Sequence, residues 1–491
     1  MCLVPTIEKR VLRRYKIFES IGKGAYGEVF RGKDRKTGKI VAIKKCSKCF
    51  SNKIDAQRVF REVFYLKSLK HVNIISLIDV LMGSDFKDLY LIFPYFPSDL
   101  HAVIRSGILQ DIHREYVIFQ LFLALTFLHS GDILHRDLKP SNILIDSDCK
   151  INVGDFGMSR GISRGDSPIS EPHCSVMTDH VATRWYRAPE LLFGVRNYST
   201  AVDIWAVGCL MAELFSGKPL FPGTCSLNQL TRIINLIGYP TDKQISSMKS
   251  PYVIPLLESL PISIPPPKPK KRPSLLAPSP LDGRSRSSSR ERPSTIHKSK
   301  STSQVLSKTA SATRSFTRSL SQEPPTTLHP NHMLSSITSD PELSQKFAYC
   351  TPSAHTVNRL RMTLPCAPAE AIDLISRMLL FDPACRITAE DALHHPYLAQ
   401  FARGEGSAEK HSMSLPVIPV PHLTSPISLP LSDDVTYDIT TYASLVSKLV
   451  NSLGKGQNTF ISKKSKSARV SREPKYTSPS SHKKSKSARY E

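Results

Sequence analysis

The sequence predicts an α+β protein in which a small β-rich region precedes a larger helical one. Residues 15–93 alternate short β-like runs around one helical stretch, whereas helical patterns predominate from about 100 to 240 and return after 368. Between these parts the composition changes, because Pro, Ser, Thr, Lys and Arg dominate residues 262–345. With 491 residues, 40% of them hydrophobic, the chain can bury at least one large core.

The individual elements follow from the spacing of apolar residues. Four β-like runs are predicted, at Tyr15–Ile21, Gly27–Lys33, Ile40–Lys45 and Leu89–Phe93. Helices are predicted near 55–69, at Pro368–Leu380, at Ala389–Ala399 and at Tyr442–Leu453. In the last of these, one helical face carries Leu445, Val446, Leu449, Val450 and Leu453.

We predict one globular unit over residues 15–401, interrupted by a low-complexity insert over 262–355. A C-terminal extension (402–454) and a basic tail (455–491) follow. The composition of the insert and tail cannot bury enough apolar surface to fold, so disorder is expected in both. Of the formal net charge of +24, residues 262–345 carry +8 and residues 455–491 carry +9. These two arms therefore predict anionic partners, whereas the rest of the chain is only mildly basic.

The sequence also predicts where the protein resides. No segment reaches the roughly 18 consecutive apolar residues that a membrane span needs, and the first ten residues lack the apolar run of a secretory signal. We expect a cytoplasmic protein with ten reduced cysteines. Lys268-Pro-Lys-Lys-Arg272 fits either a nuclear localisation signal or a solvated linker. Cys46 and Cys49 form a single C-x-x-C, which lacks the second pair of a zinc site.

A glycine motif follows the first β-like run. It reads Gly22-Lys-Gly24-Ala-Tyr-Gly27-Glu-Val29. A G-x-G-x-x-G motif alone is weak evidence, since it also occurs in dinucleotide-binding folds, where a helix comes directly after the glycines. Here Glu28–Lys33 is predicted to be another strand, so the motif forms a hairpin that can lie over phosphate groups.

Four further motifs follow in order. They are Val41-Ala-Ile-Lys44, His135-Arg-Asp137-Leu-Lys139-Pro-Ser-Asn142, Asp155-Phe-Gly157 and Ala188-Pro-Glu190. Lys44 can reach phosphate oxygens if a carboxylate fixes its ammonium group, and Glu62 in the predicted helix is the candidate. Each residue alone is more typical of a solvated surface charge, but five ordered motifs do not arise by chance.

In these motifs the sequence resembles the eukaryotic protein kinase superfamily, over residues 15–261 and about 356–401. Arg184-Trp-Tyr-Arg187 and Thr178-Asp-His180 resemble the mitogen-activated protein kinases, and most of all their atypical extracellular-signal-regulated branch. The resemblance implies a fold with a small β-rich N-lobe and a larger helical C-lobe. It also implies that Leu431–Leu453 packs back on the small lobe, and that Glu190 pairs with Arg386 in a structural role.

The resemblance implies a protein serine/threonine kinase that uses ATP and Mg²⁺ and acts on protein substrates. Asp137 is expected to accept the hydrogen bond of the substrate hydroxyl, and Lys139 to neutralise charge on the transferring phosphoryl group. The full catalytic set is Asp137, Lys139, Lys44, Glu62 and Thr183. ATP is expected to contact Ile21, Gly22, Gly24, Gly27, Val29, Ala42, Lys44, Phe93, Phe96, Asp99 and Leu144. Asn142 and Asp155 are hard oxygen ligands suited to Mg²⁺.

The resemblance also implies how the enzyme is regulated. Phosphorylation of Thr178, by an upstream kinase or by the chain itself, is expected to engage Arg61, Arg136 and Arg160. Arg184 and Arg187 resemble the arginines that favour proline after the acceptor residue.

Three positions depart from the family pattern. Pro94 stands where relatives often have an acidic residue, but proline keeps the carbonyl that contacts adenine. His180 replaces the usual tyrosine. The stretch after Leu398 lacks the paired aspartates that conventional members use for docking, which puts that route in doubt.

Parts of the sequence also fit three alternative functions. A cyclin-dependent kinase is the nearest enzymatic rival, but Arg184 and the Thr178-x-His180 motif favour the mitogen-activated type. A pseudokinase scaffold that recruits partners through its basic arms conflicts with intact Lys44, Asp137, Asn142 and Asp155. Binding of nucleic acid or microtubules through the arms would be nonspecific, because they lack interleaved aromatic residues.

Overall fold

The computed structural model describes most of the predicted globular unit and part of the C-terminal extension. The described residues are 7–24, 27–85, 87–162, 184–195, 198–261, 350–402, 422–432 and 435–464, with the backbone alone for 453–464. All of them belong to one compact unit. Residues 262–349 of the predicted insert, the tail beyond 464, Thr178, His180 and Thr183 lie outside the described residues.

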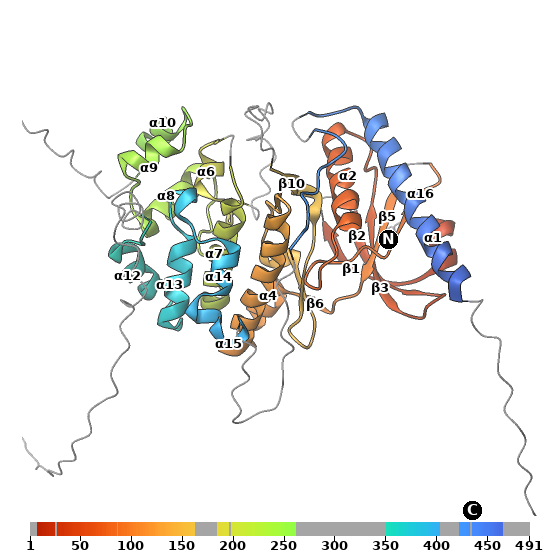
Figure 1. Cartoon of the computed structure of the whole chain (residues 1–491), viewed down its shortest axis with the longest axis horizontal. Coiled ribbons are helices and arrows are strands. Elements are labelled where there is room, and N and C mark those ends of the chain that lie inside the picture. The colour runs from red at the N-terminus through yellow and green to blue at the C-terminus, as the bar shows by residue number, and fades with distance from the viewer. Residues whose placement is uncertain are drawn as a thin grey trace, which may run out of the picture. The chain divides into compact units, whose positions relative to one another are not determined.

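The N-terminal region is a five-stranded antiparallel sheet with the strand order β1-β2-β3-β5-β4 (Figure 1). The strands are β1 (Tyr15–Gly24), β2 (Gly27–Asp34), β3 (Ile40–Cys46), β4 (Asp79–Met82) and β5 (Leu89–Pro94). Four of them begin at the predicted residues, and β4 was not predicted. The sheet thus confirms the β-rich N-terminal region.

Two helices accompany this sheet. In the short helix α1 (Lys9–Arg14), Val11 is buried with Tyr15 and Phe30 in a cluster of its own. Helix α2 (Lys53–Ser68) begins two residues before its predicted start, where the Asn52 side chain accepts a hydrogen bond from the Asp55 N–H. Because α2 buries Glu62 and Arg61 as well as its apolar face, it can bring charges toward a site.

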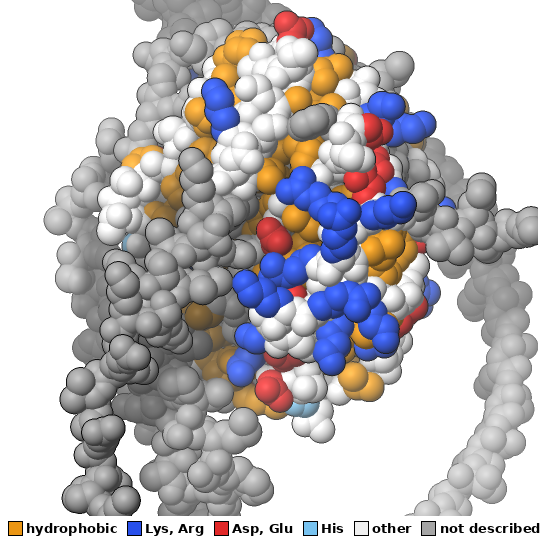
Figure 2. Space-filling model, turned by 90° about the vertical axis from the view of Figure 1, so that its right-hand side faces the viewer, with side chains coloured by type: hydrophobic (Ala, Val, Ile, Leu, Met, Phe, Trp, Pro, Cys, Tyr) orange, Lys and Arg blue, Asp and Glu red, His pale blue; other side chains and the backbone are white. Residues whose placement is uncertain are grey.

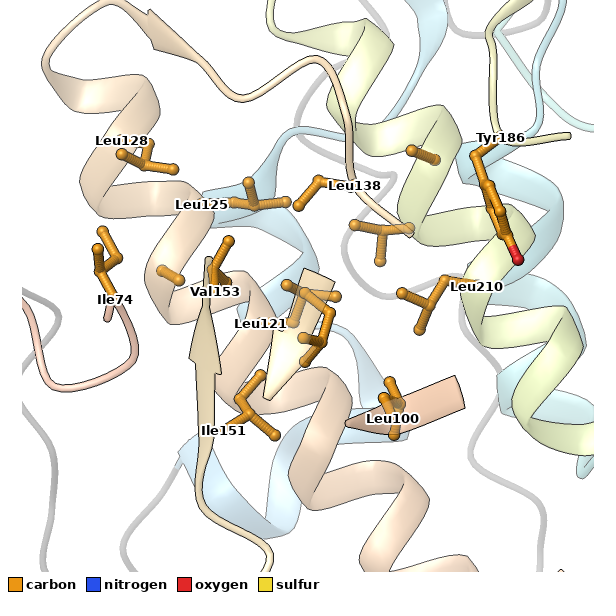
Figure 3. Packing of buried hydrophobic residues seen from close by; sticks show 14 of the residues in the cluster. Ile74, Leu100, Leu121, Leu125, Leu128, Leu138, Ile151, Val153, Tyr186 and Leu210 are labelled. Atoms are coloured by element: carbon orange, nitrogen blue, oxygen red, sulfur yellow. The ribbon is translucent and has the colours of Figure 1, made fainter. Parts of the chain in front are cut away.

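The C-terminal region is mainly helical, as predicted, and surrounds one large core. Its longer helices are α3 (Leu100–Ser106), α4 (Asp111–Ser130), α7 (Ala201–Ser216), α8 (Ser226–Ile237), α12 (Ala354–Thr363) and α13 (Ala369–Met378). Shorter ones are α6 (Pro189–Leu192), α9 (Asp242–Ser247) and α10 (Val253–Glu258). Figure 3 shows Leu138 extending into the same core as Leu125 of α4 and Leu210 of α7. Apolar packing of Leu138 in the core therefore anchors the loop that carries the His-Arg-Asp motif.

Five short strands follow the N-terminal sheet in the sequence. They are β6 (Ser98–Asp99), β7 (Ile133–Leu134), β8 (Ile143–Ile145), β9 (Ile151–Val153) and β10 (Arg160–Gly161). Strands β6, β8 and β9 form one small sheet, and β7 pairs with β10 in another. The loop with the His-Arg-Asp motif lies between β7 and β8, and the Asp-Phe-Gly turn lies between β9 and β10. The paired strands therefore fix both ends of each loop.

The structure corrects three expectations. The predicted helix at Ala389–Ala399 is broken into α14 (Ala389–Leu393), a 3₁₀ turn and α15 (Ala399–Ala402), because Pro396 has no N–H for a continuous helix. Helix α12 begins at Ala354, inside the insert predicted to run to 355. Cys350 and Cys385 form a disulfide rather than two thiols, because the turn after Asp382 brings their Cα atoms within 4.8 Å.

The C-terminal extension returns to the N-terminal region, as the resemblance implied. Helix α16 (Ile439–Lys464) contacts α2 and β4 and begins three residues earlier than predicted. It also continues eleven residues beyond its predicted end at Leu453, so the first ten residues of the tail predicted to be disordered are helical. Tyr442 and Val446 are buried against this region, and the Tyr442 ring lies 5.7 Å from that of Phe60. Upstream, Leu423 contacts the turn after α4, where its N–H donates to Ser130 Oγ at 2.9 Å. None of the helices in the described part of the chain has the length and apolar composition for a membrane crossing.

Candidate active site

The glycine motif forms the hairpin between β1 and β2. Gly22 pairs with Val29 and Gly24 with Gly27 in the antiparallel register, so no helix follows the glycines. This topology excludes the dinucleotide-binding alternative. Gly27 has φ +147°, and a Cβ placed on it would lie 1.8 Å from the Lys45 carbonyl oxygen. Only glycine fits there.

A charge pair joins the sheet to helix α2. Lys44 Nζ lies 2.7 Å from Glu62 Oε1, and the Glu62 side chain is 6% exposed. Burial acts to lower the pKa of Lys44, but the carboxylates of Glu62 and Asp155 outweigh it and raise that pKa. Burial raises the pKa of Glu62, against the attraction of Lys44. The lysine therefore stays charged, at a fixed position beside Asp155.

The Asp-Phe-Gly turn lies against the same helix. Asp155 adopts a left-handed backbone conformation with φ 61°, and Phe156 is fully buried, with its ring 5.0 Å from that of His135. An added Cβ on Gly157 would lie 3.7 Å from the Arg58 carbonyl oxygen of α2. Burial alone would raise the pKa of Asp155, yet Lys44 and Lys139 hold it below its ordinary value. Asp155 is therefore an ionised carboxylate in a buried position.

The loop after β7 brings together three residues predicted for the site: the hydrogen-bond acceptor Asp137, the cation Lys139 and the amide of Asn142. Lys139 Nζ lies 2.7 Å from Asp137 Oδ2. The Asn142 side-chain amide donates to the Asp137 carbonyl oxygen at 2.8 Å and to Oδ2 at 3.1 Å. Asp137 Oδ1 is buried and has no hydrogen-bond partner among the described residues. One oxygen of Asp137 is thus held in place while the other remains an unused acceptor.

Asp203 organises this loop, and sequence reasoning missed it. The carboxylate of Asp203, fully buried in α7, accepts hydrogen bonds from the backbone N–H of His135 at 2.9 Å and of Arg136 at 2.8 Å. Its Oδ2 also lies 3.1 Å from His129 Nε2. Burial acts to raise the pKa of Asp203, but these hydrogen bonds lower it. The sequence signal was present, because Asp203 is an acid in the otherwise apolar run Ala201–Met211.

The predicted adenine site lies between the sheet and the C-terminal region. In the β3–β5 register Ala42 pairs with Phe93, and Val41 pairs with Pro94. The predicted contacts are partly or largely accessible, apart from buried Phe93: Ile21, Gly22 and Gly24 are exposed, and Val29, Ala42, Phe96 and Leu144 are half-buried. Asp99 caps helix α3 by accepting from the Ala102 N–H at 2.9 Å. A ribose contact would have to share this carboxylate with the helix.

The residues around Asp155 fit a magnesium ion. Asn142 donates through its nitrogen to Asp137, which leaves its amide oxygen for a cation. An ionised carboxylate and an amide oxygen are hard ligands. No group of three or more His, Cys, Asp or Glu side chains forms a metal cluster within the described ranges. Two protein ligands suffice for Mg²⁺, which is commonly completed by phosphate oxygens and water.

The three arginines expected to receive a phosphate lie on adjoining elements. Arg61 belongs to α2, Arg136 to the loop after β7, and Arg160 to β10, where it pairs with Leu134. Arg136 has φ 67°, and its Nη1 donates to the Met158 carbonyl oxygen at 3.2 Å. The expected phosphate acceptor Thr178, the nearby His180 and Thr183, which was expected to be catalytic, lie outside the described residues.

The Ala-Pro-Glu motif is tied to the end of the helical region, as predicted. Arg386 donates from Nη1 and Nη2 to the two carboxylate oxygens of Glu190, at 2.6 and 2.7 Å, and both side chains are almost completely buried. Leu191, the residue after Glu190, lines a small pocket together with Asp137, Tyr186 and Arg187. The pair thus fixes the segment on which that pocket depends.

Comparison with known proteins agrees with this geometry. The protein kinase domain family matches residues 15–398. Mitogen-activated protein kinase 15 of Xenopus laevis is 34% identical over 448 residues, which are 91% of this chain and 58% of the frog protein. Extracellular signal-regulated kinase 2 of Dictyostelium discoideum is 48% identical over 260 residues, 53% of this chain and 70% of that protein.

A third relative matches over a similar span. Mitogen-activated protein kinase 15 of Caenorhabditis elegans is 42% identical over 257 residues, 52% of this chain and 55% of the nematode protein. The chain therefore spans less than two thirds of the length of the frog and nematode relatives. It belongs to the protein kinase family, among the mitogen-activated protein kinases of the atypical extracellular-signal-regulated branch.

Proposed function

We propose that this chain transfers the terminal phosphoryl group of ATP to serine and threonine hydroxyls of other proteins. The proposal rests on the arrangement of three charged side chains. Lys44 is paired with Glu62 and lies beside an ionised Asp155. Phosphoryl transfer requires this lysine–glutamate pair and this aspartate to be in place together.

The proposed roles follow from the geometry. Asp137 accepts the hydrogen bond of the substrate hydroxyl through its unused Oδ1 and orients the oxygen for in-line attack. Lys139, held at 2.7 Å from Oδ2, supplies positive charge toward the transferring group. Lys44 contacts the phosphates of bound ATP. Mg²⁺, held by Asp155 and Asn142, screens the negative charge of the phosphates when it is bound.

We propose further that the enzyme is proline-directed. Arg184 is buried, and its Nη1 donates to the Thr224 carbonyl oxygen at 2.9 Å, while the Trp185 indole donates to the Gly223 carbonyl oxygen at 3.1 Å. These bonds fix the backbone that precedes Arg187, which lines the pocket beside Asp137. A rigid pocket of this kind supports selection of the residue after the acceptor.

Activation is proposed to depend on a phosphate at Thr178, added by an upstream kinase or by the chain itself. Arg61, Arg136 and Arg160 come from three elements that a single phosphate with nearly two negative charges would draw together. His180 has no hydroxyl, so it cannot form the phosphate ester that a tyrosine at this position would form. The proposed location is the cytoplasm and the nucleus.

The test uses full-length protein with Mg-ATP and three peptides that differ only at the acceptor region: Ser-Pro, Thr-Pro and Ser-Ala. We expect phosphate on the first two, strong preference over Ser-Ala, and phosphate on Thr178 in the active protein by mass spectrometry. Asp137→Asn serves as the control that keeps the ATP contacts, and it should lower turnover by about 10²–10⁴-fold.

The possible failures can be told apart. Equal phosphorylation of all three peptides would refute proline direction alone. Full activity of Thr178→Ala would refute the activation step alone. Turnover that survives Asp137→Asn would refute the assignment of the catalytic site.

A further inference from the structure

Helix α1 and the end of the β1–β2–β3 sheet carry a dense group of exposed cations. Figure 2 looks onto the side of the molecule on which α1 lies in Figure 1, and Lys and Arg side chains gather across that face. We define the basic corner as the exposed Lys and Arg residues of α1, the start of β1, the end of β2 and the β2–β3 turn, which are Lys9, Arg10, Arg13, Lys16, Lys33, Arg35, Lys36 and Lys39.

The basic corner rests on a fixed backbone. Arg14 Nε and Nη2 donate to the two carboxylate oxygens of Asp34 at 2.9 and 3.0 Å, which joins α1 to the β2–β3 turn. Arg35 adds two bonds, from its N–H to the Arg14 carbonyl oxygen and from Nε to that of Leu12. Beneath them Val11 is 1% exposed. Because this backbone is already ordered, presenting the cations to a ligand costs little further entropy.

Local carboxylates do not neutralise the basic corner. Asp34 is the one acid within residues 9–16 and 31–40; it is 3% exposed and is bonded to Arg14, the Lys36 N–H and Thr37 Oγ1. The Glu8 carboxylate accepts from the Ser84 N–H. Within the part of the chain that the structure describes, no carboxylate forms an ion pair with the eight cations.

The strand register adds to the repulsion among the cations of the basic corner. Lys16 and Lys33 stand directly opposite each other in the β1–β2 pairing, an arrangement that destabilises a sheet. A charge pattern that weakens the free protein is relieved when an anionic surface covers it.

We propose that the basic corner binds the anionic headgroup surface of a lipid bilayer. Two aliphatic side chains stand among the cations, Leu12 with 41% and Ile40 with 39% of its surface exposed. They can enter the boundary between headgroups and acyl chains, whereas a phosphodiester backbone offers them no contact. Because Val11 is buried, α1 has no free apolar face, so attachment is peripheral and mainly electrostatic.

The surroundings of the basic corner argue against single-stranded nucleic acid as its ligand. Stacking on bases requires exposed aromatic rings. Phe18 is an exposed ring two residues from Lys16, and cationic groups of Lys16 and Arg31 already lie 5.6 and 5.0 Å from its centroid. The tail over 455–491 carries +9, so it can reinforce attachment to the same membrane.

The test measures partition of the full-length protein onto vesicles of phosphatidylcholine and phosphatidylserine, with pure phosphatidylcholine vesicles as the reference. The test variant carries Arg10→Gln, Arg13→Gln, Lys36→Gln and Lys39→Gln, none of which alters a described side-chain bond. The matched control carries Arg105→Gln, Lys218→Gln, Lys249→Gln and Arg361→Gln, four exposed cations of the helical region. Peptide phosphorylation in solution should be the same for all three proteins, which shows that they are folded.

We expect the test variant to lose about tenfold or more in partition onto anionic vesicles, and the control to lose little. Raising the salt concentration should weaken binding of the wild-type protein. An equal loss in both variants would overturn the proposal in favour of net charge, and no loss in either would assign the binding to the tail. Failure of the wild-type protein to bind anionic vesicles, or a test-variant defect seen only with duplex DNA, would also overturn it.

Discussion

Lys44 Nζ lies 2.7 Å from Glu62 Oε1, so a charge pair joins strand β3 to the inner side of helix α2. Phe60, two residues before Glu62 and therefore on another side of the helix, packs on Tyr442 of α16. Helix α2 is thus held from two directions, by the sheet and by the C-terminal extension. The position of Glu62 depends on both.

We predict that Glu62→Gln lowers kcat/KM for ATP by about tenfold to a hundredfold, the usual range when a hydrogen bond to a charged group is lost. The ammonium group of Lys44 would then have Asp155 as its remaining carboxylate neighbour and would move away from the phosphates. Steady-state kinetics with a small peptide measures the effect. Glu258→Gln, an exposed residue of α10, is the control and should behave like the wild-type protein. Unchanged kinetics in Glu62→Gln would contradict the role of the pair.

The second prediction concerns the outer contact of the same helix. Tyr442→Ala should destabilise the protein by about 3–5 kcal/mol, as expected for truncation of a buried aromatic side chain. It should also raise the KM for ATP, because α2 loses its support behind Phe60. Thermal unfolding and kinetics measure the two effects, with Ser444→Ala on the exposed side of α16 as control. A lowered melting temperature with unchanged KM would show that α16 stabilises the fold without positioning Glu62.

Much of this arrangement was predictable from local sequence signals. The first residues of four strands were predicted from the pattern of apolar residues, and the Lys44–Glu62 pair was predicted from the sequence motifs. Both signals lie within short stretches of the sequence. Strand β4 was missed because four residues give too short a pattern. The depth of Tyr442 was also missed, since its burial depends on a partner helix almost 400 residues away in the chain.

The remaining features required tertiary structure. The left-handed conformations of Arg136 and Asp155 arise where the surrounding bonds over-determine the backbone, so no local preference announces them. The Cys350–Cys385 disulfide joins residues 35 positions apart on separate elements, and spacing alone could not pair them. Asp203 did leave a signal, an acid among apolar neighbours, but its partners belong to a distant loop.

The third prediction concerns the buried pair between Glu190 and Arg386. Glu190→Gln should destabilise the protein by about 3–5 kcal/mol, because it leaves a buried guanidinium without its counter-charge. Arg386 would keep its bonds to the Ala201 and Leu380 carbonyl oxygens and its place 5.0 Å from the Trp205 ring, so the fold should survive at low temperature. Urea unfolding tests this, with exposed Glu390→Gln as control. Equal midpoints for the two variants would refute it.

The last prediction is a pH dependence of stability that arises at His71. Its ring stacks on Phe127, with centroids 4.9 Å apart, and its Nδ1 accepts a hydrogen bond from the Asn73 N–H at 3.1 Å. The ring proton is therefore on Nε2, which is buried without a hydrogen-bond partner among the described residues. Burial lowers the pKa of His71 to about 4, whereas in the unfolded chain it is about 6.5.

Between these two pKa values the unfolded state binds a proton at His71 that the folded state does not. The resulting stability is fully present above about pH 6.5 and is lost as the pH falls toward 4, by about 3 kcal/mol in total. His71→Asn keeps an acceptor for the Asn73 N–H but cannot titrate, so its urea midpoint should fall less than that of the wild-type protein between about pH 7 and pH 5. His355→Asn, at an exposed position of α12, should retain the wild-type slope. Parallel slopes for His71→Asn and the wild-type protein would show that folding does not lower the pKa of His71 and that the acid sensitivity arises elsewhere.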